Sequence, residues 1–127
     1  MGYIVDSNIW IEFFNRRNYF DSVSGLLNDN KAYINGIILA ELIPSSRAKR
    51  EEEFIECLYG IELLELYIDW DEIIEMQYCC IKNGINKLGL LDIAIAQNAK
   101  QNNAGIFTLD RHMILLCNLI GVECRNS

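Results

Sequence analysis

Short β-favouring runs alternate along the chain with longer segments whose apolar residues recur at helical spacing, and this alternation constrains the fold most. The runs lie at residues 3–5, 32–34, 63–68 and 106–108, with a further candidate edge strand at 121–124. Strands joined through helices typically become neighbours in a parallel sheet, with helices packed on both of its faces. The sequence therefore predicts an α/β fold with a central, mainly parallel sheet. No linker or repeat divides residues 1–127, so we expect a single domain.

The helical segments carry recognisable start and stop signals. The trio Asp6-Ser7-Asn8 is typical of a helix N-terminus, and Pro44 is expected to end or bend the helix that precedes it. Asp69 or Asp71 should cap a helix that ends at Gly84. The other expected helices cover residues 9–14, 19–27, 37–43, 47–59, 90–102 and 111–117. The inner stripe expected for the helix before Gly84 is Ile73, Ile74, Tyr78 and Ile81.

The charge balance argues at first against a nucleic-acid-binding protein. The formal net charge is −7, whereas phosphate contacts require Lys and Arg. Net charge describes the long-range field rather than one site, however. A site that holds divalent cations must itself be acidic, and the bound cations then supply positive charge to a phosphate. The acidic composition therefore does not exclude a metal-dependent site for nucleic acid.

Five cysteines are present, and their spacing contains no C-x-x-C pair. With the single histidine, His112, they form no zinc-type pattern, so we expect reduced thiols in a cytoplasmic protein. The N-terminal residues do not resemble a signal peptide, and no apolar run approaches the ~20 residues of a membrane helix. The cysteines are Cys57, Cys79, Cys80, Cys117 and Cys124.

Two acidic residues follow directly on predicted strands. Asp6 comes after residues 3–5, and Asp110 comes just after residues 106–108. Ligand sites in parallel sheets form outside the carboxyl ends of the strands. The placement of Asp6 and Asp110 is therefore the first indication of a functional site.

Two further carboxylates interrupt apolar helical segments. Glu41 lies among Ile37, Ile38 and Leu42, and Asp92 has similarly apolar neighbours. An ionised carboxylate on a core-facing stripe costs several kcal/mol unless a cation or strong hydrogen bonds compensate. Two such placements in one small domain suggest that both side chains reach the same site.

A cluster of Asp6, Glu41, Asp92 and Asp110 would repel itself without a cation, and an all-oxygen cluster suits Mg²⁺ or Mn²⁺. Each residue also has a structural explanation. Asp6, Asp92 and Asp110 could each simply cap a helix or shape a turn, and Glu41 could pair with Arg47. The structural explanation must hold separately at all four positions, which favours the metal site.

Four motifs, in this order, resemble the PIN domain, and especially the VapC-like toxins of prokaryotic toxin–antitoxin pairs. They are Ile4-Val5-Asp6-Ser7-Asn8, Ala40-Glu41-Leu42, residues 91–96 (LDIAIA) and residues 107–113 (FTLDRHM). The resemblance spans essentially the whole chain. The chain departs from the usual pattern at Met113, where relatives carry an aromatic residue, and in a compact stretch at residues 87–91.

The resemblance implies a three-layer α/β/α sandwich and a ribonuclease that uses Mg²⁺ or Mn²⁺. It assigns Asp6, Glu41, Asp92 and Asp110 to the acidic metal pocket, and it also implies a cognate antitoxin and a homodimer. Metal-activated water would attack the phosphodiester and release a 3′-hydroxyl. The supporting hydrogen-bonding residues implied by the resemblance are Ser7, Asn8 and Thr108.

The sequence indicates the residues that would contact an RNA backbone less specifically than it indicates the acid cluster. Arg111, Lys87 and Arg16 are candidates because they are cationic, although each could be an ordinary solvated side chain. His112 is expected to be structural. Trp10 and Phe14 share a helix face and are expected to be core or dimer contacts rather than base-stacking platforms.

Two other functions remain open from the residues. A receiver-type phosphoacceptor domain also gathers acids and Mg²⁺, and residues 66–70 offer Asp69 as its phosphorylated residue. Glu41 and Asp92 on helices do not fit that alternative. A PIN-like RNA-binding scaffold that has lost catalysis is the other alternative, against which the intact acid set argues.

Overall fold

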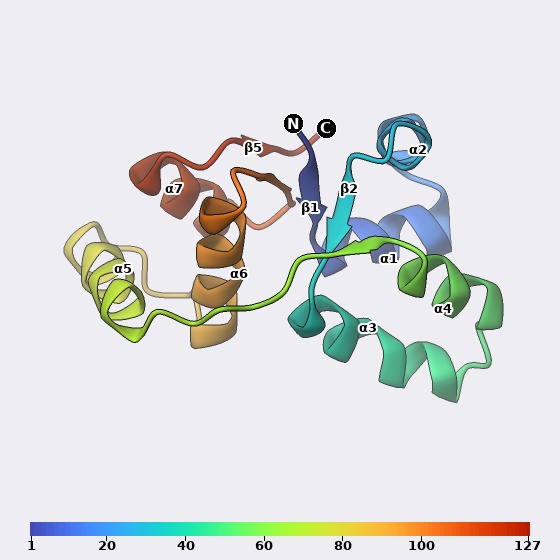
Figure 1. Cartoon of the computed structure of the whole chain (residues 1–127), viewed down its shortest axis with the longest axis horizontal. Coiled ribbons are helices and arrows are strands. Elements are labelled where there is room, and N and C mark those ends of the chain that lie inside the picture. Colours follow the sequence, from blue (N-terminus) through green and yellow to red (C-terminus); the bar gives the residue numbers. More distant parts are fainter.

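The computed structural model describes all 127 residues and confirms the predicted α/β fold (Figure 1). The strands are β1 (Tyr3–Val5), β2 (Ala32–Ile34), β3 (Glu62–Leu63), β4 (Gly105–Phe107) and β5 (Cys124–Arg125). They form one sheet of order β3-β2-β1-β4-β5, and every neighbouring pair is parallel. Ile4 of the central strand pairs with Tyr33 on one side and Ile106 on the other.

Seven helices cover the two faces of the sheet. They are α1 (Ser7–Arg16), α2 (Phe20–Asn28), α3 (Gly36–Ala48), α4 (Glu52–Tyr59), α5 (Trp70–Lys82), α6 (Leu90–Gln101) and α7 (Arg111–Ile120). The first four lie on one side of the sheet and the last three on the other (Figure 1). The predicted three-layer α/β/α sandwich is confirmed.

The central strands are buried on both faces, which is why their sequences are continuously apolar rather than alternating. Ile4, Val5, Ile106 and Phe107 are fully buried and belong to one core of 29 residues. Trp10 of α1 is also buried in this core, as predicted. The core fixes β1 and β4 side by side, and therefore fixes the residues that follow each of them.

Pro44 lies inside α3 and neither ends nor interrupts it, so the predicted helix end at residue 43 was wrong. Proline removes the hydrogen bond that its N–H would donate to the carbonyl of Ala40. Both Ala40 and Pro44 are exposed, so water can satisfy that carbonyl. The helix continues to Ala48, and the expected helix over residues 47–59 begins only at Glu52.

The third strand is shorter than predicted. The expected strand at 63–68 is reduced to Glu62–Leu63, because its partner β2 ends at Ile34 and gives way to α3. The chain then crosses from one half of the molecule to the other in an extended segment before Trp70 (Figure 1).

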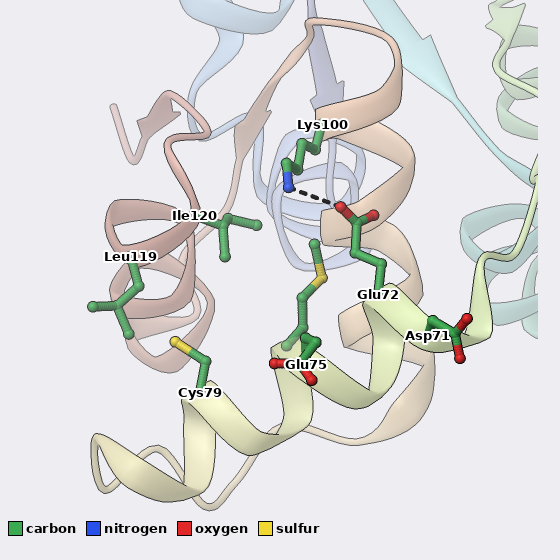
Figure 2. Close-up of a pocket in the computed structure, with 8 residues that line it drawn as sticks. Asp71, Glu72, Glu75, Cys79, Lys100, Leu119 and Ile120 are labelled. Atoms are coloured by element: carbon green, nitrogen blue, oxygen red, sulfur yellow. Dashed lines mark hydrogen bonds and ion pairs between the residues drawn. The ribbon is translucent and has the colours of Figure 1, made fainter.

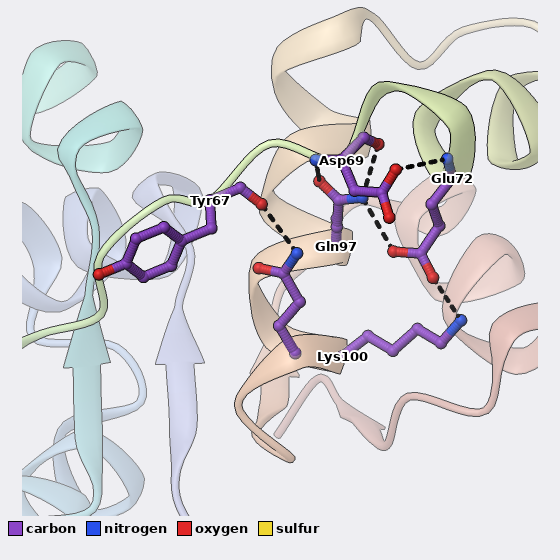
Figure 3. A network of polar contacts seen from close by, with 6 residues as sticks. Tyr67, Asp69, Glu72, Gln97 and Lys100 are labelled. Atoms are coloured by element: carbon purple, nitrogen blue, oxygen red, sulfur yellow. Dashed lines mark hydrogen bonds and ion pairs between the residues drawn. The ribbon is translucent and has the colours of Figure 1, made fainter.

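Amide side chains of α6 hold this extended segment in place (Figure 3). The side chain of Gln97 donates to the carbonyl of Asp69 (3.0 Å) and accepts from its N–H (3.2 Å). Asn98 donates to the carbonyl of Glu65 at 2.9 Å, and Gln101 donates to that of Tyr67 at 2.8 Å. Side chains thus replace the missing strand partner and satisfy backbone groups that would otherwise lack one.

The inner stripe predicted for α5 was largely wrong. Ile73 is buried as expected, but its buried companions are Met76 and Cys80. Asp69 is the N-cap, one of the two residues predicted for that role. The three remaining members of the predicted stripe, Ile74, Tyr78 and Ile81, are exposed. The helix was predicted correctly, but α5 carries two apolar stripes. Only the tertiary packing decides which of them is buried.

Candidate active site

Asp6 lies at the topological switch point of the sheet. From β1 the chain goes on to β2, which lies on one side of β1 in the sheet. On the other side of β1 lies β4, which is followed by β5. A crevice forms at such a point, outside the carboxyl ends of the two strands. Asp6 directly follows β1, and Thr108 directly follows β4, so both side chains lie at this edge.

Hydrogen bonds from the start of α1 and from the residue that follows β4 fix the carboxylate of Asp6. Its Oδ1 accepts the N–H of Ser7 at 2.8 Å, which makes Asp6 the N-cap of α1. Its Oδ2 accepts the hydroxyl of Thr108 at 2.8 Å and the side-chain amide of Asn8 at 3.4 Å. Asn8 in turn donates to Thr108 Oγ1 (3.2 Å) and accepts the N–H of Leu109 (3.1 Å). The three predicted supporting residues, Ser7, Asn8 and Thr108, therefore all donate to the Asp6 carboxylate, Ser7 through its backbone N–H.

The same network positions Asp110. Its N–H donates to Thr108 Oγ1 at 3.1 Å, and its Oδ1 accepts the N–H groups of His112 (2.9 Å) and Met113 (3.4 Å). Asp110 is therefore the N-cap of α7 as well as a neighbour of Asp6. Asp6 and Asp110 each cap a helix, which is the structural role considered for them. The hydrogen bonds of the cap orient each carboxylate but do not neutralise its charge.

Asp92 and Glu41 reach the region from opposite sides of the sheet. Asp92 is half-buried in the first turn of α6, where Oδ2 accepts the N–H of Gly89 at 3.1 Å. Glu41, on α3, is exposed, so its expected position on a core-facing stripe was wrong. The apolar neighbours of Glu41 that face the core are Ile38 and Leu42, and the helix turns Glu41 away from them.

The carboxylates act on one another electrostatically. Burial raises the pKa of Asp6, and the charges of Asp92 and Asp110 raise it further, against the lowering by Thr108 and Ser7. Partial removal of the Glu41 carboxyl from water raises its pKa, and the charges of Asp6 and Asp92 raise it further, whereas the Ser7 hydroxyl lowers it. Asp6 is thus the common neighbour of the other three acids.

No basic side chain compensates these four acids. The structure contains two ion pairs, Arg16–Glu12 at 3.6 Å and Lys100–Glu72 at 2.8 Å, and neither involves the cluster. The alternative in which Glu41 pairs with Arg47 is therefore wrong. The donors are carboxylate oxygens, which suit hard cations such as Mg²⁺ and Mn²⁺.

The carboxylates of Asp6 and its three acidic neighbours have no basic partner, and their oxygen atoms are suitable ligands for a divalent cation. No three of the His, Cys, Asp and Glu side chains converge into a complete metal site, however. The acids are neighbours rather than an assembled coordination sphere.

The candidate substrate-binding residues are all exposed. Arg111 is the first residue of α7, directly after Asp110, and Lys87 lies in the loop before α6. Arg16 pairs with Glu12 on the surface of α1. The ring nitrogen Nδ1 of His112 is buried without a hydrogen-bond partner.

A groove beside Glu41 was missed by the sequence analysis. Phe14 stacks on Phe54 with ring centroids 4.2 Å apart, and Leu42 lies with them in the groove wall. Phe14 is therefore a partly exposed groove residue. The helical spacing placed Phe14 on a face with Trp10, but no local pattern indicated that α4 would supply Phe54. The full lining is Ile11, Phe14, Asn15, Glu41, Leu42, Ser45, Ser46, Lys49, Glu51 and Phe54.

The larger hollow between α5 and α7 is a separate feature (Figure 2). Its volume is about 580 Å³, and Glu72 and Lys100 form an ion pair in its wall. None of the four candidate acids lines it. It is therefore not the candidate active site.

The receiver-type alternative is not supported by the position of Asp69. That alternative needs a phosphorylated aspartate at the end of the middle strand. Asp69 instead lies beyond the end of β3, which is an edge strand, and serves as the N-cap of α5.

All five cysteines are free thiols, and no helix combines the length and apolarity needed to cross a membrane.

The fold is similar to solved structures across nearly the whole chain. VapBC2 from Rickettsia felis, solved bound to a DNA fragment from its promoter, matches with a TM-score of 0.78 and 20% identity, covering 98% of both chains. FitAcB from Neisseria gonorrhoeae matches with a TM-score of 0.68 and 21% identity, covering 98% of this chain and 96% of that chain. PAE2754 from Pyrobaculum aerophilum matches with a TM-score of 0.58 and 15% identity, covering 95% and 96%.

A comparison with curated proteins gives no match. The sequence does match the family model of the PIN domain over residues 3–118, which takes in the four motifs and all four carboxylates. The chain therefore belongs to the PIN domain family.

Proposed function

We propose that this chain is a single-domain, divalent-metal-dependent endoribonuclease that hydrolyses RNA phosphodiesters. The observation that carries the proposal is the position of Asp6 at the sheet switch point, with a raised pKa and three acidic neighbours that have no basic partner. Uncompensated negative charge of this kind is costly unless a cation relieves it. Membership of the PIN domain family supports nuclease activity in general.

In this proposal Asp6, Asp92 and Asp110 hold Mg²⁺ or Mn²⁺, and Glu41 either holds the ion or orients the attacking water. When bound, the cation would lower the pKa of a water and offset charge on the phosphate. Asn8 and Thr108 fix the direction of the Asp6 carboxylate through Oδ2. Their role is to position Asp6.

Glu41 suits the role of a proton acceptor. It is the most exposed of the four acids, yet partial removal of its carboxyl from water, together with the charges of Asp6 and Asp92, raises its pKa. A base is most effective when its pKa lies near the working pH, so an upward shift from the ordinary carboxylate value favours this role. The proton from the attacking water would pass to Glu41. The bond between phosphorus and the 3′-oxygen would break, and the leaving oxygen would take a proton from solvent water to become the 3′-hydroxyl.

Positive charge for the RNA backbone would come from Arg111, Lys87 and Arg16, in addition to the cation. Arg111 has the strongest claim because it directly follows Asp110 and is exposed. The protein as a whole is acidic, so RNA binding should depend strongly on the divalent ion.

We further propose that the chain is the toxin of a toxin–antitoxin pair, acts in the cytoplasm and forms a homodimer. The similarity to VapBC2 and FitAcB supports the toxin–antitoxin part of this proposal. The groove beside Glu41 could accept an antitoxin segment, since Phe14, Leu42 and Phe54 offer apolar contacts next to the acids. A basic side chain on that segment could then neutralise the acids and silence the enzyme.

The test is cleavage of defined RNAs with Mn²⁺, with Mg²⁺ and with EDTA. Wild-type protein should cleave only with a divalent cation, and Asp6→Asn should lower the rate at least about 100-fold. Asp29→Asn is the matched control, because Asp29 is an exposed acid at the end of α2. Full activity of Asp6→Asn, or activity that survives EDTA, would refute the proposal.

The alternative of an inactive PIN-like RNA-binding scaffold predicts a different outcome. Such a scaffold would bind RNA without cleaving it and would show no stabilisation by Mn²⁺. Thermal unfolding at increasing Mn²⁺ concentration therefore separates the two functions.

A further inference from the structure

A buried hydrogen bond between two asparagine side chains joins the two halves of the molecule. Asn35 directly follows β2 and belongs to the half that contains α1 to α4, whereas Asn98 lies on α6 in the other half (Figure 1). Nδ2 of Asn35 donates to Oδ1 of Asn98 at 3.0 Å, and both residues are buried. No other hydrogen bond and no ion pair connects α3 or its cap to α6. This bond is therefore the polar link between the two helices.

Further hydrogen bonds fix the orientation of both amides. Oδ1 of Asn35 accepts the N–H of Ile38 at 3.0 Å, which makes Asn35 the N-cap of α3. Nδ2 of Asn98 donates to the carbonyl of Glu65 at 2.9 Å. Each amide thus accepts with its oxygen and donates with its nitrogen, and neither can be turned over without losing both of its bonds. The link therefore has one defined geometry.

The two linked helices each carry one of the candidate acids. Glu41 lies on α3 within about two turns of Asn35, and Asp92 lies on α6 within about two turns of Asn98. Helices hold their side chains more precisely than loops do, so the asparagine contact governs how far apart the two carboxylates lie. The charge of Asp92 reaches Glu41, whose pKa it raises. A shift of α3 relative to α6 would change the separation between Glu41 and Asp92 directly.

The chemistry of the link suits a positioning role. Two apolar side chains could fill the same volume without the cost of burying polar groups, but they would not select one relative position of the helices. An ion pair could select a position, but its charges would shift the pKa values of the neighbouring acids. A satisfied pair of amides fixes the geometry and adds no charge.

We propose that Asn35 and Asn98 are positioning residues of the candidate active site, and that their hydrogen bond sets the separation between Glu41 and Asp92. The inference rests on the proposed function, in which Asp92 holds the metal ion and Glu41 holds the ion or accepts the proton of the attacking water. Both asparagines act through the helices that they join, and neither is assigned a contact with the ion or with RNA.

Asn35→Ser breaks the link and keeps the cap. The serine hydroxyl is a good N-cap that can accept the N–H of Ile38, but its side chain is too short to reach Asn98. With Mn²⁺ and a defined RNA, kcat should fall at least about 10-fold and KM should change less than about 3-fold, because misplaced groups slow the reaction while RNA still binds.

A second measurement reports the geometry without RNA. Bound Mn²⁺ broadens the NMR signals of nearby amides according to their distance from the ion. In Asn35→Ser the broadening of the α3 amides should differ from that in the wild-type protein, because α3 moves relative to the ion, whereas the broadening of the α7 amides should stay the same.

Gln97→Ala is the matched control. Gln97 precedes Asn98 on α6 and is equally buried, but its side chain bonds to Asp69 and Glu72 rather than to the cap of α3. Its replacement should lower the stability, which urea unfolding measures, and should leave kcat and the α3 broadening as in the wild-type protein. All variants are compared at a temperature at which they are folded.

Asn98→Leu breaks the link from the other side. If both asparagines act through one bond, kcat of the double variant should be no lower than that of the slower single variant, whereas multiplied losses would overturn the shared role. Should Asn98→Leu not fold, Asn35→Ser and its control decide the question.

The outcomes separate this inference from the proposed function. A wild-type protein that shows neither Mn²⁺-dependent cleavage nor Mn²⁺ broadening overturns the proposed function and the positioning role with it. A wild-type protein that binds Mn²⁺, together with an Asn35→Ser variant whose kcat and α3 broadening are unchanged, overturns the positioning role alone. Equal losses of kcat in Gln97→Ala and Asn35→Ser would do the same.

Discussion

The hydroxyl of Thr108 donates a 2.8 Å hydrogen bond to Oδ2 of Asp6, across a sequence separation of 102 residues. Thr108 Oγ1 also accepts the N–H of Asp110 and the side-chain amide of Asn8. One buried hydroxyl thus orients two of the candidate metal ligands relative to each other.

Thr108→Val should therefore destabilise the protein by about 1–3 kcal/mol, because it leaves buried polar groups without their partner. It should also raise the pKa of Asp6 further, since the Thr108 hydrogen bond lowers that pKa. Urea unfolding measures the first effect. Thr108→Ser keeps the hydroxyl and is the control, so equal stability losses in the two variants would contradict the role assigned to the hydroxyl.

The stability of the metal-free protein should depend on the ionisation of Asp6. Burial and the neighbouring acids raise the pKa of Asp6 above its ordinary value of 3.8, so the folded state binds the proton more tightly than the unfolded chain. The contribution of Asp6 to the free energy of unfolding is most favourable below pH 3.8. It is lost as the pH rises through the raised pKa of Asp6 in the folded state. Asp6→Asn should thus stabilise the metal-free protein most at neutral pH. Unfolding of both proteins from pH 3 to 8, without metal, would reveal a difference that shrinks toward acid pH.

Binding of Mn²⁺ should stabilise the folded protein. A ligand present at 100 times its dissociation constant contributes about 2.7 kcal/mol, and the increase in Tm should disappear on addition of EDTA. Asp6→Asn should abolish this increase while Asp29→Asn keeps it, which thermal unfolding at several Mn²⁺ concentrations can measure. A wild-type Tm that does not respond to Mn²⁺ or Mg²⁺ would support the scaffold alternative.

The position and order of the extended segment before α5 should depend on the hydrogen bonds of Asn98. This fully packed residue accepts a hydrogen bond from Asn35 at 3.0 Å and donates one to the carbonyl of Glu65 at 2.9 Å. Asn98→Ala should cost about 1–3 kcal/mol and increase hydrogen exchange at residues 64–69, because the buried amide of Asn35 and the carbonyl of Glu65 lose their partner. Gln101→Ala removes a single, exposed bond to Tyr67 and should have a smaller effect.

The sequence by itself determined the features that depend on neighbouring residues. The strands at Tyr3–Val5 and Ala32–Ile34 could be predicted from their composition, and Asp6 could be predicted as the cap that follows the first of them. Such patterns depend only on residues within one or two turns of each other, so they can be recognised without knowledge of the fold. The motifs around Asp6 and Asp110 likewise indicated the family before the structure placed them together.

Only the tertiary structure decided which apolar stripe of α5 is buried, how far β3 extends and where Glu41 points. Ile73 and Ile74 are equally apolar, and the choice between them depends on how α5 packs against α6, which is a contact between two helices and not a property of either one. The pairing of β1 with β4 likewise brings Asp6 next to Thr108 and Asp110. These outcomes follow from long-range packing, whose free energy is shared among many residues and is not encoded at any one position.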